Sequence, residues 1–198
     1  MFVLGLTGSM GMGKTTTANM FADAGVPVHD ADATVHRLYA GEAVAMIEAA
    51  FPGTTKDGKV DRTTLRARLV GDVPALRRLE AIVHPLVRQA EETFLAEAEK
   101  RGAAAAVLDI PLLFETGGDK RVDAVIVVTA PPDVQRARML ERGISPGQLE
   151  TLLARQMPDA EKRRRADFVV DTSRGLQPAR TQVQDILAAI VTMPKRRP

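Results

Sequence analysis

The sequence predicts an α/β protein with three layers, α/β/α, built on a five-stranded parallel sheet with a helical insertion and a lid. Five short and almost continuous apolar runs recur along the chain, with helical stretches between them. Such runs are typical of strands covered on both faces, as they are in a parallel sheet. The length of 198 residues fits one domain with an insertion. The predicted strands are residues 2–7, 26–30, 104–110, 124–129 and 167–171.

A helical insertion is predicted at about residues 33–102, between the second and third strands. This stretch is far longer than a crossover between parallel strands requires. Within it, residues 34–51 and 62–101 predict helices, and the turn-rich residues 52–58 join them. We expect the insertion to be a helical part of one domain that spans residues 1–198.

A lid is predicted at about residues 132–166. Helices are expected at residues 133–142 and 148–157, with a glycine and a Pro-Gly pair between them. The block is rich in arginine, which fits a lid over an anionic ligand. A solvated pair of amphipathic helices explains the same composition equally well. The last residues, 193–198, are expected to form a disordered basic tail.

The composition limits the classes of protein. Hydrophobic residues make up 45% of the chain and charged residues 26%, which excludes a wholly disordered protein. The absence of cysteine excludes disulfides, cysteine-ligated zinc, iron-sulfur clusters and thiol catalysis. No apolar run approaches the ~18 residues of a membrane-spanning helix, and the first residues show no export signal. We therefore expect a cytoplasmic protein that does not associate with a membrane.

The charge balance indicates an anionic partner without naming it. The chain has 27 Lys and Arg against 25 Asp and Glu, a net charge of +2. The basic residues gather at residues 162–165 and 195–197. For residues 162–165 a solvated helix face is the favoured interpretation.

A phosphate-binding loop stands at residues 8–15, where Gly-Ser-Met-Gly-Met-Gly-Lys-Thr matches G-x-x-x-x-G-K-[ST]. An apolar strand precedes it and a helix-compatible stretch, residues 16–24, follows it. Its glycines allow backbone N–H groups to surround phosphate oxygens at a helix N-terminus. Lys14 can reach the β and γ phosphates, and the Thr15 hydroxyl can bind Mg²⁺. The predicted fold is therefore a P-loop fold, and ATP with Mg²⁺ is the expected ligand.

A signalling GTPase is disfavoured. The only asparagine is Asn19, so an N-K-x-D motif cannot exist, and no aspartate stands three residues before a glycine as D-x-x-G requires. The remaining classes are a phosphotransferase and an ATPase with a mechanical or nucleic-acid role.

Two aspartates, Asp30 and Asp32, lie at the end of the second predicted strand, the side on which ligands bind in parallel sheets. A carboxylate there can accept the proton of an attacking hydroxyl group or bind Mg²⁺ through water. The alternative is that one of them caps the helix that begins near Ala33. His84 and Pro85 lie in the insertion, where Pro85 could simply open a helix.

Two further segments are candidates for the site. Residues 111–115, Pro-Leu-Leu-Phe-Glu, follow the third strand, and Asp109 has the place of a Walker B aspartate; core packing is the alternative for residues 112–114. Arg138 and Arg142 are four residues apart and share a helix face with Gln135, so they can clamp a triphosphate. Surface pairing with Glu141 is the alternative.

Taken together, these segments closely resemble dephospho-coenzyme A kinases. The resemblance extends to about residue 191, with the segments in the expected order and spacing. A phosphate loop is shared by many families, whereas the D-A-D, H-P and P-L-L-F-E segments are far more specific. The matching segments are residues 5–15, 30–32, 84–85, 111–115 and 166–171.

The resemblance implies ATP-dependent phosphorylation of the ribose 3'-hydroxyl of dephospho-CoA, the last step of coenzyme A synthesis. The partners would be ATP and dephospho-CoA with no nucleic acid, and a monomer is the default. The implied catalytic residues are Asp32, Lys14 and Arg142, with Thr15 as the metal ligand. The implied ATP-binding residues are Gly8, Gly11, Met12, Gly13, Lys14, Thr15, Thr16, Arg138 and Arg142. The implied acceptor-binding residues are Asp32, His84, Pro85, Leu112, Leu113, Phe114 and Glu115.

The chain departs from the family pattern at two places. Residues 171–174 read Asp-Thr-Ser-Arg where Asp-Asn-Ser-Gly is usual, which puts an adenine-side role of that loop in question. Ser9 and Met12 replace the usual Gly and Ser but leave the glycines of the loop in place. Two rival functions remain: another small-molecule or nucleoside monophosphate kinase, and an ATPase that binds nucleic acid through residues 162–165 and the tail.

Overall fold

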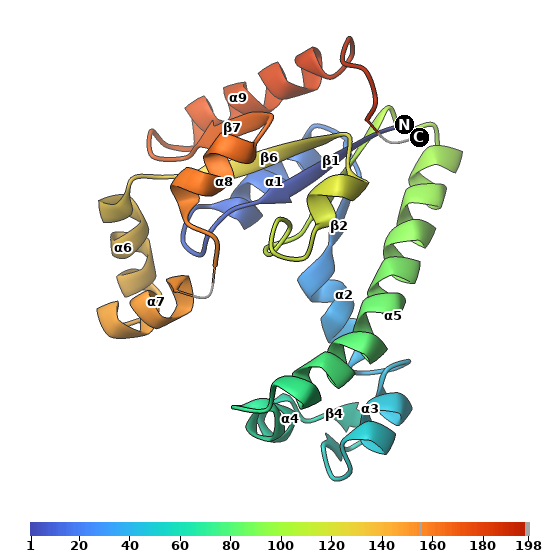
Figure 1. Cartoon of the computed structure of the whole chain (residues 1–198). Coiled ribbons are helices and arrows are strands. Elements are labelled where there is room, and N and C mark those ends of the chain that lie inside the picture. The colour runs from blue at the N-terminus through green and yellow to red at the C-terminus, as the bar shows by residue number, and fades with distance from the viewer. Residues whose placement is uncertain (155, 197–198) are drawn as a thin grey trace. The chain divides into compact units, whose positions relative to one another are not determined.

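The computed structural model describes residues 1–154 and 156–196 and consists of two compact units (Figure 1). The first unit contains Met1–His29 and the chain from Ala98 onward, and the second contains Asp30–Glu97. No helix in the described parts of the chain is long and apolar enough to cross a membrane.

A five-stranded parallel sheet forms the centre of the first unit, which confirms the predicted fold class. Its strand order is β2-β5-β1-β6-β7, and each recorded pairing is parallel. Because β1 is central, the loop that follows it emerges in the middle of the carboxyl edge. The strands are β1 (Phe2–Thr7), β2 (Val28–Asp30), β5 (Ala105–Asp109), β6 (Ala124–Thr129) and β7 (Phe168–Asp171).

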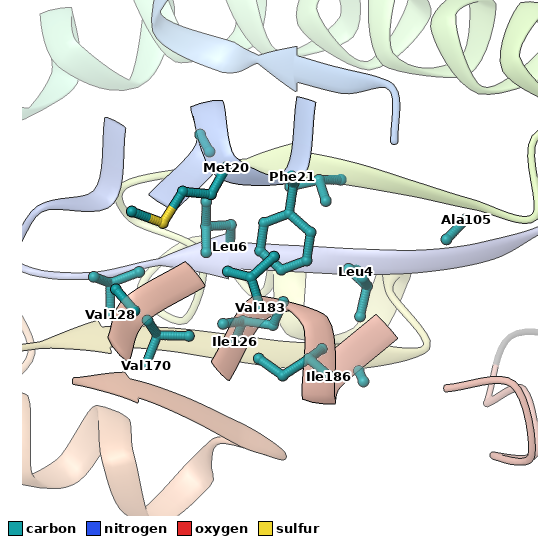
Figure 2. Close-up of a cluster of buried hydrophobic side chains, with 14 of the residues drawn as sticks. Leu4, Leu6, Met20, Phe21, Ala105, Ile126, Val128, Val170, Val183 and Ile186 are labelled. Carbon is teal, nitrogen blue, oxygen red and sulfur yellow. The ribbon is translucent and has the colours of Figure 1, made fainter. Parts of the chain in front are cut away.

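Helices α1 (Lys14–Asp23) and α9 (Leu176–Ala189) cover one face of this sheet. Phe2, Leu4 and Leu6 alternate along β1 and point into the core on that face. Figure 2 shows Phe21 of α1 and Val183 of α9 packed among the side chains of the strands. This core fixes the strand and the helix on either side of the phosphate-binding loop.

The remainder of the first unit contains three helices of the predicted lid and a short 3-10 helix. They are α6 (Pro132–Glu141), α7 (Pro146–Leu153), α8 (Asp159–Arg165) and η1 (Gly118–Arg121). The predicted helix at residues 148–157 begins earlier and ends at Leu153, and α8 was not predicted. Pro158 stands immediately before α8, as proline commonly does at a helix start.

The second unit is mainly helical and has its own apolar core. Its elements are α2 (Ala31–Leu38), α3 (Val44–Ala50), β3 (Thr55–Lys56), β4 (Lys59–Val60), α4 (Arg62–Leu69) and most of α5 (Val73–Lys100). The two long helices predicted here are each broken. Gly71 adopts a positive φ of 79°, and the Asp72 carboxylate accepts a hydrogen bond from the N–H of Ala75, so α4 ends and α5 begins there.

Two details of the second unit differ from the expectations. The turn-rich stretch forms a β-hairpin, β3 with β4, whose turn places Asp57 and Gly58 at positive φ. Pro85 does not open a helix, because it lies inside α5. The proline leaves the carbonyl group of Ala81, four residues earlier, without its helical donor, and Ala81 is exposed, so water can bond that group.

Two expectations about the basic residues are wrong. Lys162 was expected on a solvated face, but its side chain is fully buried and its Nζ lies 3.0 Å from Oε1 of Glu115. The tail was expected to be disordered, yet Arg196 is bonded to Asp167 through its guanidinium and to Asp123 through its backbone N–H. In both cases a carboxylate distant in the sequence supplies the partner. Residues 197 and 198 of the predicted tail lie outside the described residues.

Candidate active site

The phosphate-binding loop connects β1 to α1. Gly11 and Gly13 have φ of 81° and 92°, a conformation that residues with a side chain rarely adopt. Gly13 is the N-cap of α1, and no side chain caps the helix there. The first N–H groups of α1 are therefore available to an anion, and the positive end of the helix dipole favours one.

Lys14 is the first residue of α1, and its Nζ lies 2.5 Å from Oδ1 of Asp109 at the end of β5. The Asp109 side chain is only 4% exposed, and that of Lys14 is 17% exposed. Strands β5 and β1 are neighbours in the sheet, so the pairing of Leu6 with Asp109 brings the carboxylate beside the loop. The predicted Walker B position is thus occupied by a buried carboxylate that holds the lysine of the loop.

The hydroxyl groups of Thr15 and Thr16 belong to exposed residues in the first turn of α1. Among the described residues no group of three or more His, Cys, Asp or Glu side chains could hold a metal ion. A magnesium ion commonly takes few protein ligands and several from substrate phosphates and water. The single hydroxyl of Thr15 at the loop fits a metal that arrives with a nucleotide.

Arg138 lies in α6 and binds the protein itself. Its Nη1 donates to the carbonyl oxygen of Gly11 at 3.3 Å and to Oγ1 of Thr172 at 2.8 Å, and its Nη2 donates to the Thr172 carbonyl oxygen at 2.8 Å. Arg142, the C-cap of the same helix, is exposed, and its side chain makes no hydrogen bond or ion pair within the described parts of the chain. The two predicted clamp residues therefore have different surroundings.

Asp171 ends β7 next to Thr172. Hydrogen bonds from Ser173 lower the pKa of this carboxyl group. Burial opposes them with a smaller effect, and the charges of Arg174 and Arg138 add the least lowering. Its Oδ1 accepts the N–H of Ser173 at 2.8 Å. The loop after β7 is thus held in a defined turn beside the phosphate-binding loop.

The Pro111 to Glu115 segment is tied to the sheet, because the hydroxyl of Thr7 donates to the carbonyl oxygen of Pro111 at 2.9 Å. Leu112 is 40% exposed, whereas Leu113 and Phe114 are buried. Core packing, the stated alternative, therefore holds for Leu113 and Phe114. Among residues 112–115, Leu112 and Glu115 are the two that remain exposed and could contact a ligand.

The predicted lid is bonded to the rest of its unit near both ends. Arg138 near the end of α6 holds the phosphate-binding loop, as described above. At the other end, the Asp159 carboxylate accepts from the hydroxyl of Thr129 at 2.9 Å, and the N–H of Met157 donates to Oε1 of Glu115 at 2.8 Å. The segment between Arg142 and Met157, which includes α7, is the part without such anchors among the described residues.

Three of the predicted acceptor residues, Asp32, His84 and Pro85, belong to the second compact unit, and the segment at residues 112–115 belongs to the first. Asp30 caps α2, and its Oδ1 accepts the N–H of Ala33 at 3.0 Å. Asp32 lies in the first turn of α2 and is exposed, and its carboxylate makes no hydrogen bond or ion pair within the described residues. Asp30 therefore has the capping role that was one of its two expected roles, and the Asp32 carboxylate has no such structural partner.

Sequence reasoning did not identify the contacts behind the phosphate-binding loop. Gln135 was noted only as sharing a face with the arginines, but its Nε2 donates to the carbonyl oxygen of Met10 at 2.6 Å. Thr172 was noted only as a departure from a family pattern, but its hydroxyl donates to the carbonyl oxygen of Met12 at 2.8 Å. The spacing of Gln135 and Arg138, three residues apart, was the one available signal.

The parallel sheet, the phosphate-binding loop after its central strand and the paired lysine define the class as a P-loop kinase fold. A dephospho-CoA kinase family model, CoaE, matches residues 2–177. The chain belongs to the dephospho-CoA kinase family. This membership confirms the predicted family and the predicted activity, ATP-dependent phosphorylation of dephospho-CoA in the last step of CoA biosynthesis, a transfer to an alcohol group.

Individual relatives agree with the family. A dephospho-CoA kinase from Rhodopseudomonas palustris strain HaA2 is 65% identical over 199 residues, which cover all of both chains. The crystal structure of TT1252 from Thermus thermophilus has a TM-score of 0.87 at 32% identity and covers 97% of this chain and 98% of that one. A dephospho-CoA kinase from Campylobacter jejuni, at 22% identity and a TM-score of 0.65 over 95% and 96% of the two chains, shares the fold.

Proposed function

We propose that the chain performs this transfer with the phosphate-binding loop on the ATP side and Asp32 on the acceptor side. The products would be ADP and coenzyme A, which carries the transferred phosphate on its ribose 3'-oxygen. The observation that carries the ATP side is the pairing of Lys14 with the buried Asp109 beside an uncapped helix N-terminus. This arrangement places one cation and several N–H donors at a single loop.

On the ATP side, Gly8, Gly11, Met12 and Gly13 form the backbone cradle, and Lys14, Thr15 and Thr16 open the helix behind it. Phosphoryl transfer requires little covalent chemistry from the protein, so positioning and charge stabilisation provide the catalysis. We assign Lys14 to the charge that develops on the transferring phosphoryl group. Arg142, the C-cap residue of α6, has a side chain without a partner in the described residues and would add a second cation there, whereas Arg138 holds the loop.

Magnesium would be held by the Thr15 hydroxyl together with phosphate oxygens and water. When bound, it would neutralise charge on the β and γ phosphates. The Lys14 ammonium, bonded to Asp109, lies at the first residue of the helix that follows the same loop.

On the acceptor side, Asp32 would accept the proton of the ribose hydroxyl group as its oxygen attacks. A ribose hydroxyl is a poor nucleophile unless its proton has an acceptor, and Asp32 is exposed with no competing partner in the described residues. His84, Pro85, Leu112 and Glu115 would contact the coenzyme A part of the acceptor. Leu113 and Phe114 would shape that segment from the core.

The contacts of the basic residues support small-molecule partners rather than nucleic acid. Lys162 pairs with Glu115, Arg163 with Asp159 and Arg165 with Asp119, so three of the four cations at residues 162–165 are already neutralised. We propose a monomer in the cytoplasm that binds neither nucleic acid nor membranes.

An ADP-release assay tests this function. The purified chain is given MgATP with dephospho-CoA, AMP, CMP, adenosine or shikimate in separate reactions. We expect ADP release only with dephospho-CoA, and phosphate on the ribose 3'-oxygen of the product by NMR. Release with AMP or shikimate at a comparable rate would identify a different small-molecule kinase, and acceptor-independent release would identify an ATPase.

A further inference from the structure

Three successive carbonyl oxygens of the phosphate-binding loop are each bonded to a side chain from outside the loop. The side chains come from α6 and from the residue after β7. The pairs are Met10 with Gln135 at 2.6 Å, Gly11 with Arg138 at 3.3 Å, and Met12 with Thr172 at 2.8 Å. We call these three side chains, Gln135, Arg138 and Thr172, the carbonyl clamp.

The clamp is itself connected and largely buried. Gln135 is 6% exposed and Thr172 is 8% exposed. A hydroxyl group has one proton to donate, which Thr172 gives to the closer carbonyl oxygen, that of Met12, while its oxygen accepts from Nη1 of Arg138 at 2.8 Å. Nη2 of Arg138 also donates to the Thr172 carbonyl oxygen, so the guanidinium holds both the side chain and the backbone of Thr172.

The packing around the glycines leaves the loop little freedom on the same side. A Cβ added at Gly13 would lie 3.2 Å from Cγ2 and from Oγ1 of Thr172, and one added at Gly11 would lie 2.9 Å from the Met139 side chain. The loop is therefore pressed against the clamp, and not separated from it by solvent.

Peptide geometry gives the clamp a consequence for ligand binding. In a trans peptide the C=O of one residue and the N–H of the next point in opposite directions. The N–H of Met12 is already donated to the carbonyl oxygen of Ser9 at 3.2 Å. Holding the carbonyl groups of Met10 and Met12 outward therefore directs the N–H groups of Gly11 and Gly13 to the opposite side of the loop.

We infer that Gln135, Arg138 and Thr172 are positioning residues that orient the N–H groups of the loop toward the ATP triphosphate. They act through the loop and do not touch the nucleotide phosphates. This inference rests on the proposed function, because it assumes that the triphosphate binds at the loop. It assigns Arg138 a supporting role and leaves Arg142 as the candidate for direct contact with the triphosphate.

The test replaces Thr172 by Val, which keeps the shape of the side chain and removes the hydroxyl group. Calorimetric binding of MgATP and of inorganic tripolyphosphate, without acceptor, should each weaken about tenfold, the effect of losing one or two hydrogen bonds. The KM for dephospho-CoA should change less than twofold. Thr172→Ser should restore both affinities, because it restores the hydroxyl group.

A matched control separates positioning from stability. Thr54 lies in the second unit, is fully buried, and its hydroxyl donates to the carbonyl oxygen of Phe51 at 2.7 Å. Thr54→Val should lower the melting temperature as Thr172→Val does, yet leave the affinities for MgATP and tripolyphosphate unchanged. If Thr172→Val does not fold, Gln135→Met is the second variant. It removes the bond to Met10 and should lower the affinities for MgATP and tripolyphosphate in the same way.

The outcomes distinguish this inference from the proposed function. If the parent protein binds no MgATP, the proposed function itself is contradicted. A parent that binds and turns over MgATP, while Thr172→Val and Gln135→Met bind tripolyphosphate with parental affinity, would overturn only the clamp. A lower affinity for MgATP with an unchanged affinity for tripolyphosphate would also overturn the inference, because the lost contacts would then be contacts to the nucleoside and not to the phosphates.

Discussion

The ammonium group of Lys162 lies 3.0 Å from Oε1 of Glu115, and the Lys162 side chain is completely buried. The distance is that of an ion pair, and Nζ has no hydrogen-bond partner within the described residues. The same oxygen accepts the N–H of Met157 at 2.8 Å. One carboxylate in the segment after β5 therefore anchors α8 and Met157, two residues before that helix begins.

Replacing Lys162 by Met should destabilise the protein by ~1 to 3 kcal/mol. Removing one partner of a fully buried ion pair costs ~3 to 5 kcal/mol, and the Glu115 side chain keeps some contact with water at 20% exposure, which reduces the cost. Denaturant unfolding followed by circular dichroism measures the change. Arg163→Met is the control, because its pair with Asp159 is more exposed and should contribute under ~0.5 kcal/mol. Equal losses in the two variants would contradict a specific role of the buried pair.

The protein should lose stability in acid at pH values near the ordinary carboxyl pKa. Burial raises the pKa of Glu115, but hydrogen bonds from Met157 and from its own N–H, with the Lys162 ammonium, lower it overall. A carboxyl group whose pKa is lower in the folded state stabilises the fold fully above its unfolded pKa of ~4, and this contribution is lost as the pH falls through the lowered value. Asp171 and Asp61 also have lowered pKa values, chiefly because of hydrogen bonds from Ser173 and Thr64.

Melting temperatures measured across a range of pH values check the direction of these pKa shifts. We expect a nearly constant melting temperature from about pH 7 to pH 5 and a fall below about pH 4. Glu115→Gln should flatten part of that fall, since the group no longer titrates. A melting temperature that rises below pH 4 would contradict the assigned pKa directions.

Arg142→Ala should reduce turnover ~100-fold with little effect on stability. Removing one preorganised donor to transition-state charge typically has an effect of that size. The side chain is exposed and makes no hydrogen bond or ion pair in the parts of the chain that are described, so its loss removes no structural contact. Steady-state kinetics and melting curves measure the two effects. Arg136→Ala, an exposed arginine of the same helix, is the control and should keep parental turnover.

The sequence allowed the sheet and the phosphate-binding loop to be predicted because both depend on local patterns. Apolar runs marked all five strands of the main sheet to within two residues, and the loop motif has a fixed spacing. The turn at Asp57-Gly58 lies within the stretch predicted to be turn-rich, although its hairpin was not predicted. The break at Gly71 had a local signal, the glycine itself, that was outweighed by the long helical stretch around it. The burial of Lys162 had none, because its partner lies in a distant segment.

The clamp behind the loop shows the same limit. Gln135, Arg138 and Thr172 contact the loop only because the topology places α6 and the end of β7 beside β1 through β6. Side-chain spacing could indicate that Gln135 and Arg138 share a face, but not which surface that face meets. Strand order and hydrogen-bond direction are tertiary information that a single sequence does not contain.

Lys14→Met should reduce turnover at least ~100-fold and also lower the melting temperature. The first effect follows from losing the cation at the transferring phosphoryl group. The second follows because the 4% exposed Asp109 carboxylate loses its ammonium partner. Adding Asp109→Asn to Lys14→Met should recover part of the melting temperature and none of the turnover. Recovery of turnover in the double variant would contradict the role of Lys14 in charge stabilisation.

Asp32→Asn should leave MgATP affinity unchanged and reduce dephospho-CoA-dependent ADP formation at least ~100-fold, the lower end of the contribution of a positioned general base. Asparagine keeps the size and the hydrogen-bonding capacity of the side chain but removes its negative charge and its basicity. Asp32 is exposed and unpaired in the described residues, so the exchange removes no structural bond. Calorimetry with MgATP and single-turnover kinetics with dephospho-CoA separate binding from transfer.

Asp30→Asn is the matched control two residues away. Its side chain caps α2 by accepting the N–H of Ala33, and asparagine caps helices as well as aspartate does. Turnover and melting temperature should therefore stay close to the parental values. If Asp32→Asn abolished MgATP binding, Asp32 would belong to the metal site. If Asp32→Asn transferred phosphate at the parental rate, the proton would have another acceptor, because a ribose hydroxyl group cannot attack efficiently while it keeps its proton.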